Sequence, residues 1–240
     1  RAGETGPSAV NDSKHVSDVI VIGGGVAGLS TAMQPATRGA AVTVIERERL
    51  GNGSTGRAAG LLGQLRGQAE HTRMLMDGLK VVERLEAEAQ LEIFIKSGSF
   101  RVAETTARAE EIDALVGMGK SIGFEIDHLA VDEVGRLLPY MKTSDLVRAC
   151  YCPTDGHLQP AELVSAYVKV GKAHGVQYVV GSPVSGIATE SGKVRGVRTA
   201  DGEYHAPAVV NAGGPWSYIN ADLAGERLPT APTGHHYLTT

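Results

Sequence analysis

Several residue types are scarce in this chain, and each scarcity excludes a class of protein. Only two cysteines, Cys150 and Cys152, occur among 240 residues, so the chain lacks the disulfide framework of small secreted domains. Their one-residue spacing in a strand-like run matches neither a redox C-x-x-C motif nor a zinc site. We therefore expect two core thiols, no metal site and a reducing compartment, either the cytoplasm or the mitochondrial matrix.

The chain also lacks an excess of basic residues and any long apolar run. Lys and Arg number 23 against 27 acidic residues, a formal net charge of −4, which argues against nucleic-acid or anionic-membrane partners. No apolar run approaches the ~20 residues that a membrane span needs, so we expect a soluble protein. The hydrophobic share of 42% is ordinary, and the length allows one large domain or two small ones.

The first residues carry little apolar character. The chain starts at Arg1, and residues 1–17 are polar and contain glycine, serine and proline without the apolar run of a signal peptide. We expect a disordered lead there, left by cloning or by processing.

Glycine, in contrast, is abundant, and residues 19–46 use it in an ordered pattern. An apolar run over residues 19–22 passes into Gly23-Gly24-Gly25-Val26-Ala27-Gly28, and a second β-branched run over residues 42–45 ends in Glu46. This order predicts a strand, a glycine turn, a helix and a second parallel strand with an acid at its end.

The residue types in this stretch fit a dinucleotide site. Gly23 permits the tight turn, Gly25 lets a pyrophosphate approach the backbone, and Gly28 lets the helix pack closely on the sheet. The helix N-terminus offers unpaired N–H groups to phosphates. Glu46 can accept hydrogen bonds from an adenosine ribose and disfavours a 2′-phosphate. The alternative is a plain structural turn.

Two further glycine-rich loops follow. Residues 51–66 are mostly small, which favours backbone lying directly against a ligand, although a flexible surface loop is the alternative. Arg57 is the single charge in residues 51–60 and could face an electron-rich ring or an anionic substrate. Residues 212–216 follow a buried-type strand and form another glycine turn that could close over the cofactor.

Periodicity gives a coarse map of the remaining elements. Helices are predicted up to about residue 38 and over 68–90, 106–121, 131–138 and 160–174, and Pro35 should kink or end the first of them. Strands are predicted in 93–103 (two), 146–152, 176–180, 184–189, 194–199, 203–205, 208–211 and 229–240, with a turn at 153–157.

Three stretches together carry a family resemblance. They are the strand with Gly23-Gly24-Gly25-Val26-Ala27-Gly28, the loop from Gly53-Ser54-Thr55 to Gln64-Leu65-Arg66, and the Asp155-Gly156-His157 turn. With residues 210–216 and 235–237 they resemble the D-amino-acid-oxidase-type flavoproteins over residues 18–240, most closely the sarcosine and dimethylglycine dehydrogenase branch. The second glycine-rich loop belongs to the flavin site, so the resemblance is specific for FAD over NAD.

The resemblance implies an α/β fold. It consists of a Rossmann-like FAD-binding domain with a parallel sheet and a small antiparallel meander, plus part of an antiparallel-sheet substrate domain. The expected division is a lead at 1–17, an FAD-binding domain at 18–92 and 151–227, and a partial substrate domain at 93–150 and 228–240. Because the family's catalytic domain continues beyond this length, we expect a fragment or the ordered portion of a longer protein.

The resemblance also implies a cofactor site. The pyrophosphate would lie at residues 23–28, the ribose on Glu46 and the isoalloxazine near residues 54–60. The other expected cofactor-binding residues are Arg47, Ser54, Thr55, Arg57, Ala58, Gly60, Leu61, Val184, Ala212, Gly213 and Trp216.

The implied enzyme oxidises the C–N bond of a small N-methylated amino acid, such as sarcosine or dimethylglycine. A hydride passes to flavin N5, water hydrolyses the imine, and oxygen or another carrier accepts the electrons. His235 matches an active-site histidine that could take the amine proton, and Arg57 is the second catalytic candidate. Arg57 replaces the histidine that several members bond covalently to FAD, so the flavin should be non-covalent. Alternatives are a flavin dehydrogenase of a 2-hydroxy acid or glycerol phosphate, and a non-catalytic flavin-binding fragment or regulatory subunit.

Overall fold

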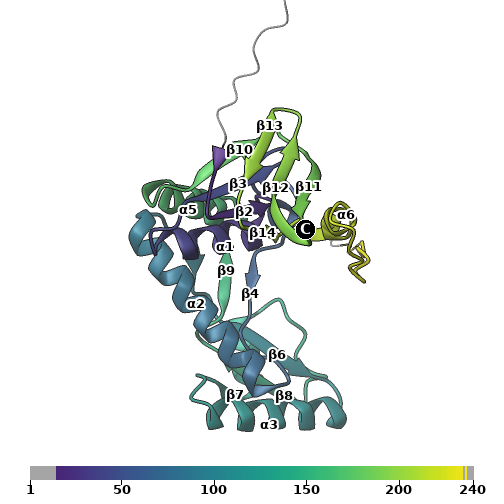
Figure 1. Cartoon of the computed structure of the whole chain (residues 1–240). Coiled ribbons are helices and arrows are strands. Elements are labelled where there is room, and N and C mark those ends of the chain that lie inside the picture. Colours follow the sequence, from purple (N-terminus) through teal and green to yellow (C-terminus); the bar gives the residue numbers. More distant parts are fainter. Residues whose placement is uncertain (1–14, 235, 237–240) are drawn as a thin grey trace, which may run out of the picture. The chain divides into compact units, whose positions relative to one another are not determined.

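The computed structural model describes residues 15–234 and 236, and the chain divides into two compact units (Figure 1). The first unit comprises the described parts of residues 1–55 and 171–240, and the second comprises residues 56–170. This division differs from the predicted domains, since residues 56–92 and 151–170 fall in the second unit.

The first unit contains a four-stranded parallel sheet in the order β10 (Gln177–Val180), β3 (Val42–Glu46), β2 (Val19–Ile22) and β14 (Ala208–Asn211). Helix α1 (Val26–Ala36) follows β2. Ile20 packs on one side of the sheet against Val197, while Val21 packs on the other side against Ala32 of α1. Burial of both faces explains the continuous apolar runs of these strands and confirms the predicted parallel sheet.

The predicted meander is also present in the first unit. Strands β11 (Val184–Glu190), β12 (Lys193–Thr199) and β13 (Gly202–His205) are antiparallel neighbours. A short 3-10 helix, η2 (Gly214–Trp216), and α6 (Ser217–Asp222) follow β14. Helix α1 ends at Ala36, one residue after Pro35, as expected for proline near a helix terminus.

The predictions for both ends of the chain need correction. Strand β1 (His15–Val16) pairs with β13, and His15 stacks on Tyr204 with ring centroids 4.6 Å apart. Ser17 is buried and hydrogen-bonds Thr43 at 2.7 Å, so disorder up to residue 17 was wrong for 15–17. Residues 1–14 lie outside the described part. Residues 229–234 hold no strand, and the rest of the strand predicted at 229–240 lies outside the description except for residue 236.

The second unit contains two antiparallel sheets. One orders β4 (Leu61–Leu62), β9 (Gly156–Leu158) and β5 (Phe94–Ile95), and the other orders β6 (Ser99–Ala103), β8 (Arg148–Cys152) and β7 (Asp127–Leu129). Its helices are α2 (Ala69–Ala89), α3 (Thr106–Ser121), α4 (Val131–Leu137) and the start of α5 (Pro160–Ala173). Strands β4 and β9 escaped prediction because two or three residues carry no readable periodicity.

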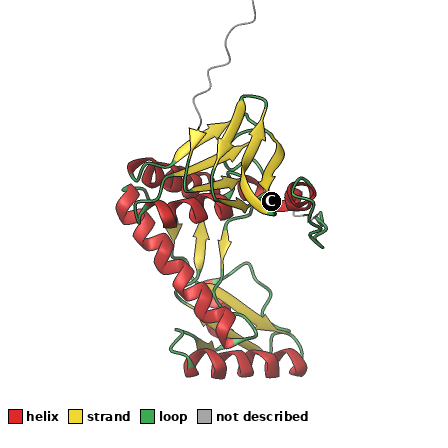
Figure 2. Cartoon of the chain, viewed as in Figure 1, coloured by secondary structure: helices red, strands yellow, loops and turns green. Residues whose placement is uncertain are grey.

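Helix α3 lies along the second of these sheets (Figure 2) and buries a common core with it. Cys150 and Cys152 are fully buried there, beside Ile112 and Val116, which confirms the predicted core thiols. The hydrogen bond that the Cys152 thiol donates to Cys150, together with burial, raises the pKa of the Cys152 thiol. Among the helices that the structure describes, none is long and apolar enough to cross a bilayer.

Burial of Tyr178 on β10 makes the stability of the first unit pH-dependent. Desolvation raises the pKa of Tyr178 to about 12 from 10.0. Between these values the unfolded chain binds fewer protons than the folded chain, so the free energy of unfolding must fall as pH rises. Denaturant unfolding measured between pH 9 and pH 12 should show that the free energy of unfolding falls less steeply with pH for Tyr178→Phe than for the natural chain. Equal slopes would contradict this assignment.

Candidate functional site

The glycine turn after β2 is shaped by two positions that exclude a side chain. Gly23 has φ +112°, and a Cβ there would lie 2.4 Å from the carbonyl oxygen of Ala212. A Cβ on Gly28 would lie 1.9 Å from the carbonyl oxygen of Gly23. Both contacts are far below van der Waals distance, so the turn and the start of α1 can approach this closely only with glycine.

The N-terminus of α1 is left open for an anion. The N-cap residue Gly25 supplies no side-chain hydrogen bond, and the first turn of α1 contains no acidic residue. A Cβ on Gly25 would meet only the Thr55 hydroxyl, at 3.1 Å. The N–H groups at this end, with the positive end of the helix dipole, therefore face no acidic side chain of the first turn, and the Thr55 hydroxyl is the group that lies beside them; this fits a pyrophosphate.

Thr55 extends this helix terminus. Its Oγ1 accepts a hydrogen bond from the backbone N–H of Val26 at 3.0 Å, although the two residues are distant in sequence. A hydroxyl that accepts one hydrogen bond can still donate its own proton. The Thr55 hydroxyl can therefore accept from the Val26 N–H and donate its own proton to an anion, which makes it a hydrogen-bond relay.

Replacing Thr55 by valine tests this relay, because valine keeps the shape and removes the hydroxyl. We expect the FAD dissociation constant of Thr55→Val to rise about tenfold, equivalent to ~1.4 kcal/mol for one hydrogen bond to a charged group. Thr55→Ser keeps the hydroxyl and should stay within about twofold of the natural chain. Calorimetric titration measures both values, and equal affinity for Thr55→Val would rule the relay out.

Glu46 lies at the end of β3 and already holds two backbone groups. Its Oε2 accepts from the N–H of Gly24 at 2.7 Å, and its Oε1 accepts from the N–H of Glu48 at 2.9 Å. A carboxylate offers about four lone-pair sites, so sites remain for ribose hydroxyls. The acid both fixes the glycine turn and stays available to a ligand.

Arg47 and Trp216, both predicted as cofactor-binding residues, meet each other in the first unit. The Cζ atom of Arg47 lies 3.8 Å from the centroid of the Trp216 ring. Strands β3, β2 and β14 are neighbours, and the residues that follow their carboxyl ends are Arg47, Gly23 and Ala212. In open parallel sheets, ligands bind outside this edge.

The other residues predicted for the site in the first unit do not share one environment. Val184 begins β11 and packs against the core between the sheet and the meander. Gly213 follows Ala212, and Asn211 Oδ1 accepts from its N–H at 3.3 Å. Ala27 and Ser54 are exposed. His235 lies outside the described residues, so its predicted role is not tested.

Four predicted residues belong to the second unit. Arg57 ends the 3-10 helix η1 (Thr55–Arg57) and, like Ala58, is exposed. Leu61 is 82% exposed. Gly60 has φ +76°, and a Cβ there would lie 2.1 Å from the carbonyl oxygen of Leu158. The packing of β9 therefore already explains this glycine, which the sequence had assigned to a ligand.

The sequence missed a buried carboxylate in the second unit. Asp155 is 2% exposed and accepts from the backbone N–H of Gln64 at 2.9 Å and from the Ser99 hydroxyl at 2.6 Å. It thereby fixes the segment that follows β4. The only signal was the Asp155-Gly156-His157 turn, because nothing in local periodicity pairs it with Gln64.

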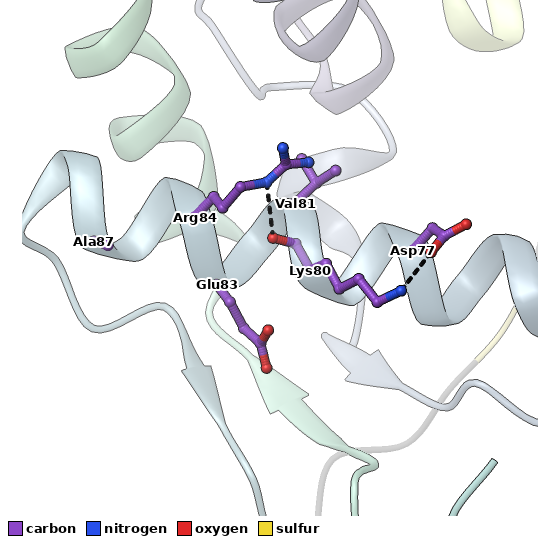
Figure 3. Close-up of a pocket in the computed structure, with 6 residues that line it drawn as sticks. All are labelled: Asp77, Lys80, Val81, Glu83, Arg84 and Ala87. Atoms are coloured by element: carbon purple, nitrogen blue, oxygen red, sulfur yellow. Dashed lines mark hydrogen bonds and ion pairs between the residues drawn. The ribbon is translucent and has the colours of Figure 1, made fainter. Parts of the chain in front are cut away.

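A hollow of about 610 Å³ lies along α2 (Figure 3), and it contains none of the predicted site residues. In this hollow Lys80 Nζ pairs with Asp77 at 2.8 Å, and Arg84 Nε donates to the Lys80 carbonyl at 3.3 Å. These charged side chains are exposed to solvent, so the hollow offers no buried catalytic group. The residues that line it are Asp77, Lys80, Val81, Glu83, Arg84 and Ala87.

The family and the relatives that this chain resembles are consistent with a dinucleotide site at the glycine turn. Residues 18–240 match the family described as FAD dependent oxidoreductase (DAO). Over 93% of its length the chain is 34% identical to the mitochondrial sarcosine dehydrogenase of Homo sapiens. It is 28% identical to the mitochondrial dimethylglycine dehydrogenase of Rattus norvegicus over 100% of the chain.

Two further matches bear on the range of functions. Over 93% of its length the chain is 28% identical to the mitochondrial pyruvate dehydrogenase phosphatase regulatory subunit of Mus musculus. The crystal structure of L-proline dehydrogenase from P.horikoshii superposes with a TM-score of 0.84 at 25% identity, covering 88% of this chain and 56% of that one. The chain spans 25%, 28% and 26% of the three curated relatives, about a quarter of their length.

Proposed function

The chain belongs to the FAD dependent oxidoreductase family, and we propose that it binds FAD non-covalently and takes part in oxidising the C–N bond of a small N-methylated amino acid. The observation that carries the cofactor proposal is the turn of residues 23–28, where Glu46 holds Gly24 and the start of α1 lies open. The names of the sarcosine and dimethylglycine dehydrogenases support the substrate class.

The residues of the first unit suit the adenosine half of FAD. Gly23 and Gly28 form the turn, Thr55 extends the N–H groups at the start of α1, and Glu46 keeps lone pairs for the ribose. When bound, FAD supplies the two-electron acceptor for the oxidation. The chain's own residues would bind and orient the dinucleotide, which is the protein's contribution to the chemistry of a cofactor.

Two residues are proposed for the substrate side. Arg57 would face the flavin ring or an anionic substrate. His235 would accept the proton of the substrate amine, because a histidine that titrates near neutrality can exchange a proton at physiological pH. Location in the cytoplasm, with the mitochondrial matrix as the alternative, is part of the same proposal.

Anaerobic reduction of the bound flavin tests the reaction class. Sarcosine, dimethylglycine and related amines should bleach the visible flavin bands, whereas 2-hydroxy acids and glycerol phosphate should not. Bleaching by a hydroxy acid alone would replace the amine proposal with the corresponding dehydrogenase. Admitting oxygen afterwards shows whether oxygen reoxidises the flavin or another carrier is needed.

Acid precipitation tests how the flavin is held. Arg57 has no ring nitrogen that could form the covalent bond to the flavin. We expect the supernatant of the precipitated holoprotein to contain all of the flavin. A yellow pellet would contradict non-covalent binding.

A non-catalytic role is the second candidate, because one relative of 28% identity is named as a regulatory subunit. In that case FAD would bind with the same dependence on Glu46, but no amine or hydroxy acid would reduce it. The reduction assay therefore separates this candidate from the enzymatic one, since FAD binding is common to both.

A further inference from the structure

Two arginine side chains of the second unit converge on one backbone carbonyl. The oxygen of Leu65 accepts a hydrogen bond from Nη1 of Arg66 at 2.8 Å and another from Nη2 of Arg101 at 2.7 Å. Arg66 lies in the segment between β4 and α2, whereas Arg101 lies on β6. Because both guanidinium groups reach the same oxygen, the fold places two positive charges from separate segments side by side.

Both guanidinium groups are held by the surrounding structure. Leu65 is fully buried, so its carbonyl is a fixed anchor. Nη1 of Arg66 also donates to the carbonyl of Gly63 at 2.9 Å, and the backbone N–H of Arg66 donates to Oγ1 of the buried Thr72 at 3.0 Å. Arg101 is fixed through the pairing of β6 with β8. A ligand of this pair would therefore have little side-chain freedom to remove on binding.

No acidic side chain neutralises the two arginines. Among the residues that the structure describes, no ion pair joins Arg66 or Arg101 to an aspartate or glutamate. Asp155 lies beside the same segment, but its carboxylate accepts from the N–H of Gln64 and from the Ser99 hydroxyl. Its single charge also offsets only one of the two cations. Two like charges on one acceptor repel each other, and a bound anion would relieve that repulsion.

Most hydrogen-bond donors of the pair have no acceptor in the described part of the chain. A guanidinium carries five N–H groups, yet Arg66 makes two side-chain hydrogen bonds and Arg101 makes one. Arg66 is exposed and Arg101 is half-buried, so a ligand can reach them from solvent. Two guanidinium groups from different segments suit a tetrahedral dianion, because a planar carboxylate is already saturated by one of them.

We propose that Arg66 and Arg101 form a binding site for the phosphate group of a small phosphomonoester. Arginine clusters recognise phosphate through charge-assisted hydrogen bonds of this kind. The site uses no residue of the proposed FAD or amine sites, so it does not depend on the proposed function. Because the attraction is between charges, the affinity falls as ionic strength rises.

Calorimetric titration with inorganic phosphate tests the proposal at pH 8, where phosphate is a dianion. The chain should bind phosphate saturably at constant ionic strength. Phenyl phosphate, a monoester, should compete because the site is open to solvent, and malonate, a dicarboxylate, should bind more weakly. The phosphate dissociation constant should rise at least about tenfold for Arg66→Met and for Arg101→Met. Arg66→Lys keeps the charge without the planar fork and should give an intermediate value.

Two control variants separate this site from general charge and from the glycine turn. Arg84→Met removes an exposed positive charge from the same unit and should bind phosphate within about twofold of the natural chain. Gly28→Ala alters the turn of the first unit and should do the same. Circular dichroism establishes that each variant is folded. Arg66→Met replaces an exposed side chain, so it decides the question even if Arg101→Met fails to fold.

Several results would overturn the proposal. The first is the absence of saturable phosphate binding to the natural chain, and the second is an unchanged phosphate affinity in Arg66→Met. Equal losses in Arg66→Met and Arg84→Met would mean that only general charge matters, and loss of binding in Gly28→Ala would place the phosphate at the glycine turn. Tighter binding of malonate, or failure of phenyl phosphate to compete, would contradict a phosphomonoester as the ligand.

Discussion

Replacing Gly28 by alanine is expected to abolish measurable FAD binding, with a dissociation constant raised more than about 100-fold. The added Cβ would lie 1.9 Å from the carbonyl oxygen of Gly23. That oxygen belongs to the backbone, so the contact cannot be relieved by a side-chain rotation. Helix α1 must move away from the turn, and the N–H groups that would hold the pyrophosphate move with it.

The same substitution should destabilise the first unit. Overpacking of a tight contact typically costs about 1–3 kcal/mol, and denaturant unfolding of Gly28→Ala should show a loss of this order. Gly78→Ala is the matched control, because Gly78 lies inside α2 and a Cβ there meets nothing within 4 Å. Alanine in that open helical position should raise stability by roughly 0.5–1 kcal/mol. A Gly28→Ala chain that binds FAD normally would show that the turn is not the site.

Replacing Glu46 by glutamine is expected to have the second largest effect. The amide can accept from only one of the two N–H groups, those of Gly24 and Glu48, and its NH₂ would face the other donor. Leaving one such group unpaired and losing the charge-assisted bonds costs about 1.5–3 kcal/mol. The FAD dissociation constant should therefore rise by roughly 10- to 100-fold.

Glu48→Gln provides the comparison for this variant. Glu48 is in the same loop and its side chain is 53% exposed, so the change removes the same charge without touching the glycine turn. We expect its FAD affinity to stay within about twofold of the natural chain. Glu46→Gln and Glu48→Gln with equal affinities would mean that Glu46 does not hold the ribose.

The sequence was sufficient for the framework of the first unit because its signals are local. The β-branched runs of β2 and β3, the glycines between them and the acid at the end of β3 each lie within one continuous stretch. Burial on both faces of a parallel sheet makes such strands uniformly apolar and therefore easy to recognise. The parallel sheet and the meander were accordingly predicted, and the FAD-dependent family followed from the resemblance of several stretches of the chain to known flavoproteins.

Contacts between residues that are distant in the sequence could not be predicted from local sequence patterns. Nothing local indicates that the Thr55 hydroxyl caps Val26 or that Arg47 stacks on Trp216. The role of Gly60 was misassigned for the same reason, since its partner Leu158 lies on a strand too short to predict. His15 and Ser17 lie in a polar stretch that predicts disorder, but they are ordered because His15 stacks on Tyr204 and Ser17 hydrogen-bonds Thr43.

The central claim is that the turn of residues 23–28 with Glu46 is a specific FAD site. Calorimetric titration of the flavin-free chain with FAD, repeated in the presence of excess NAD⁺, tests it most directly. The account predicts one FAD bound per chain and little displacement by NAD⁺. Absence of saturable FAD binding, or displacement by NAD⁺ at comparable concentration, would contradict it.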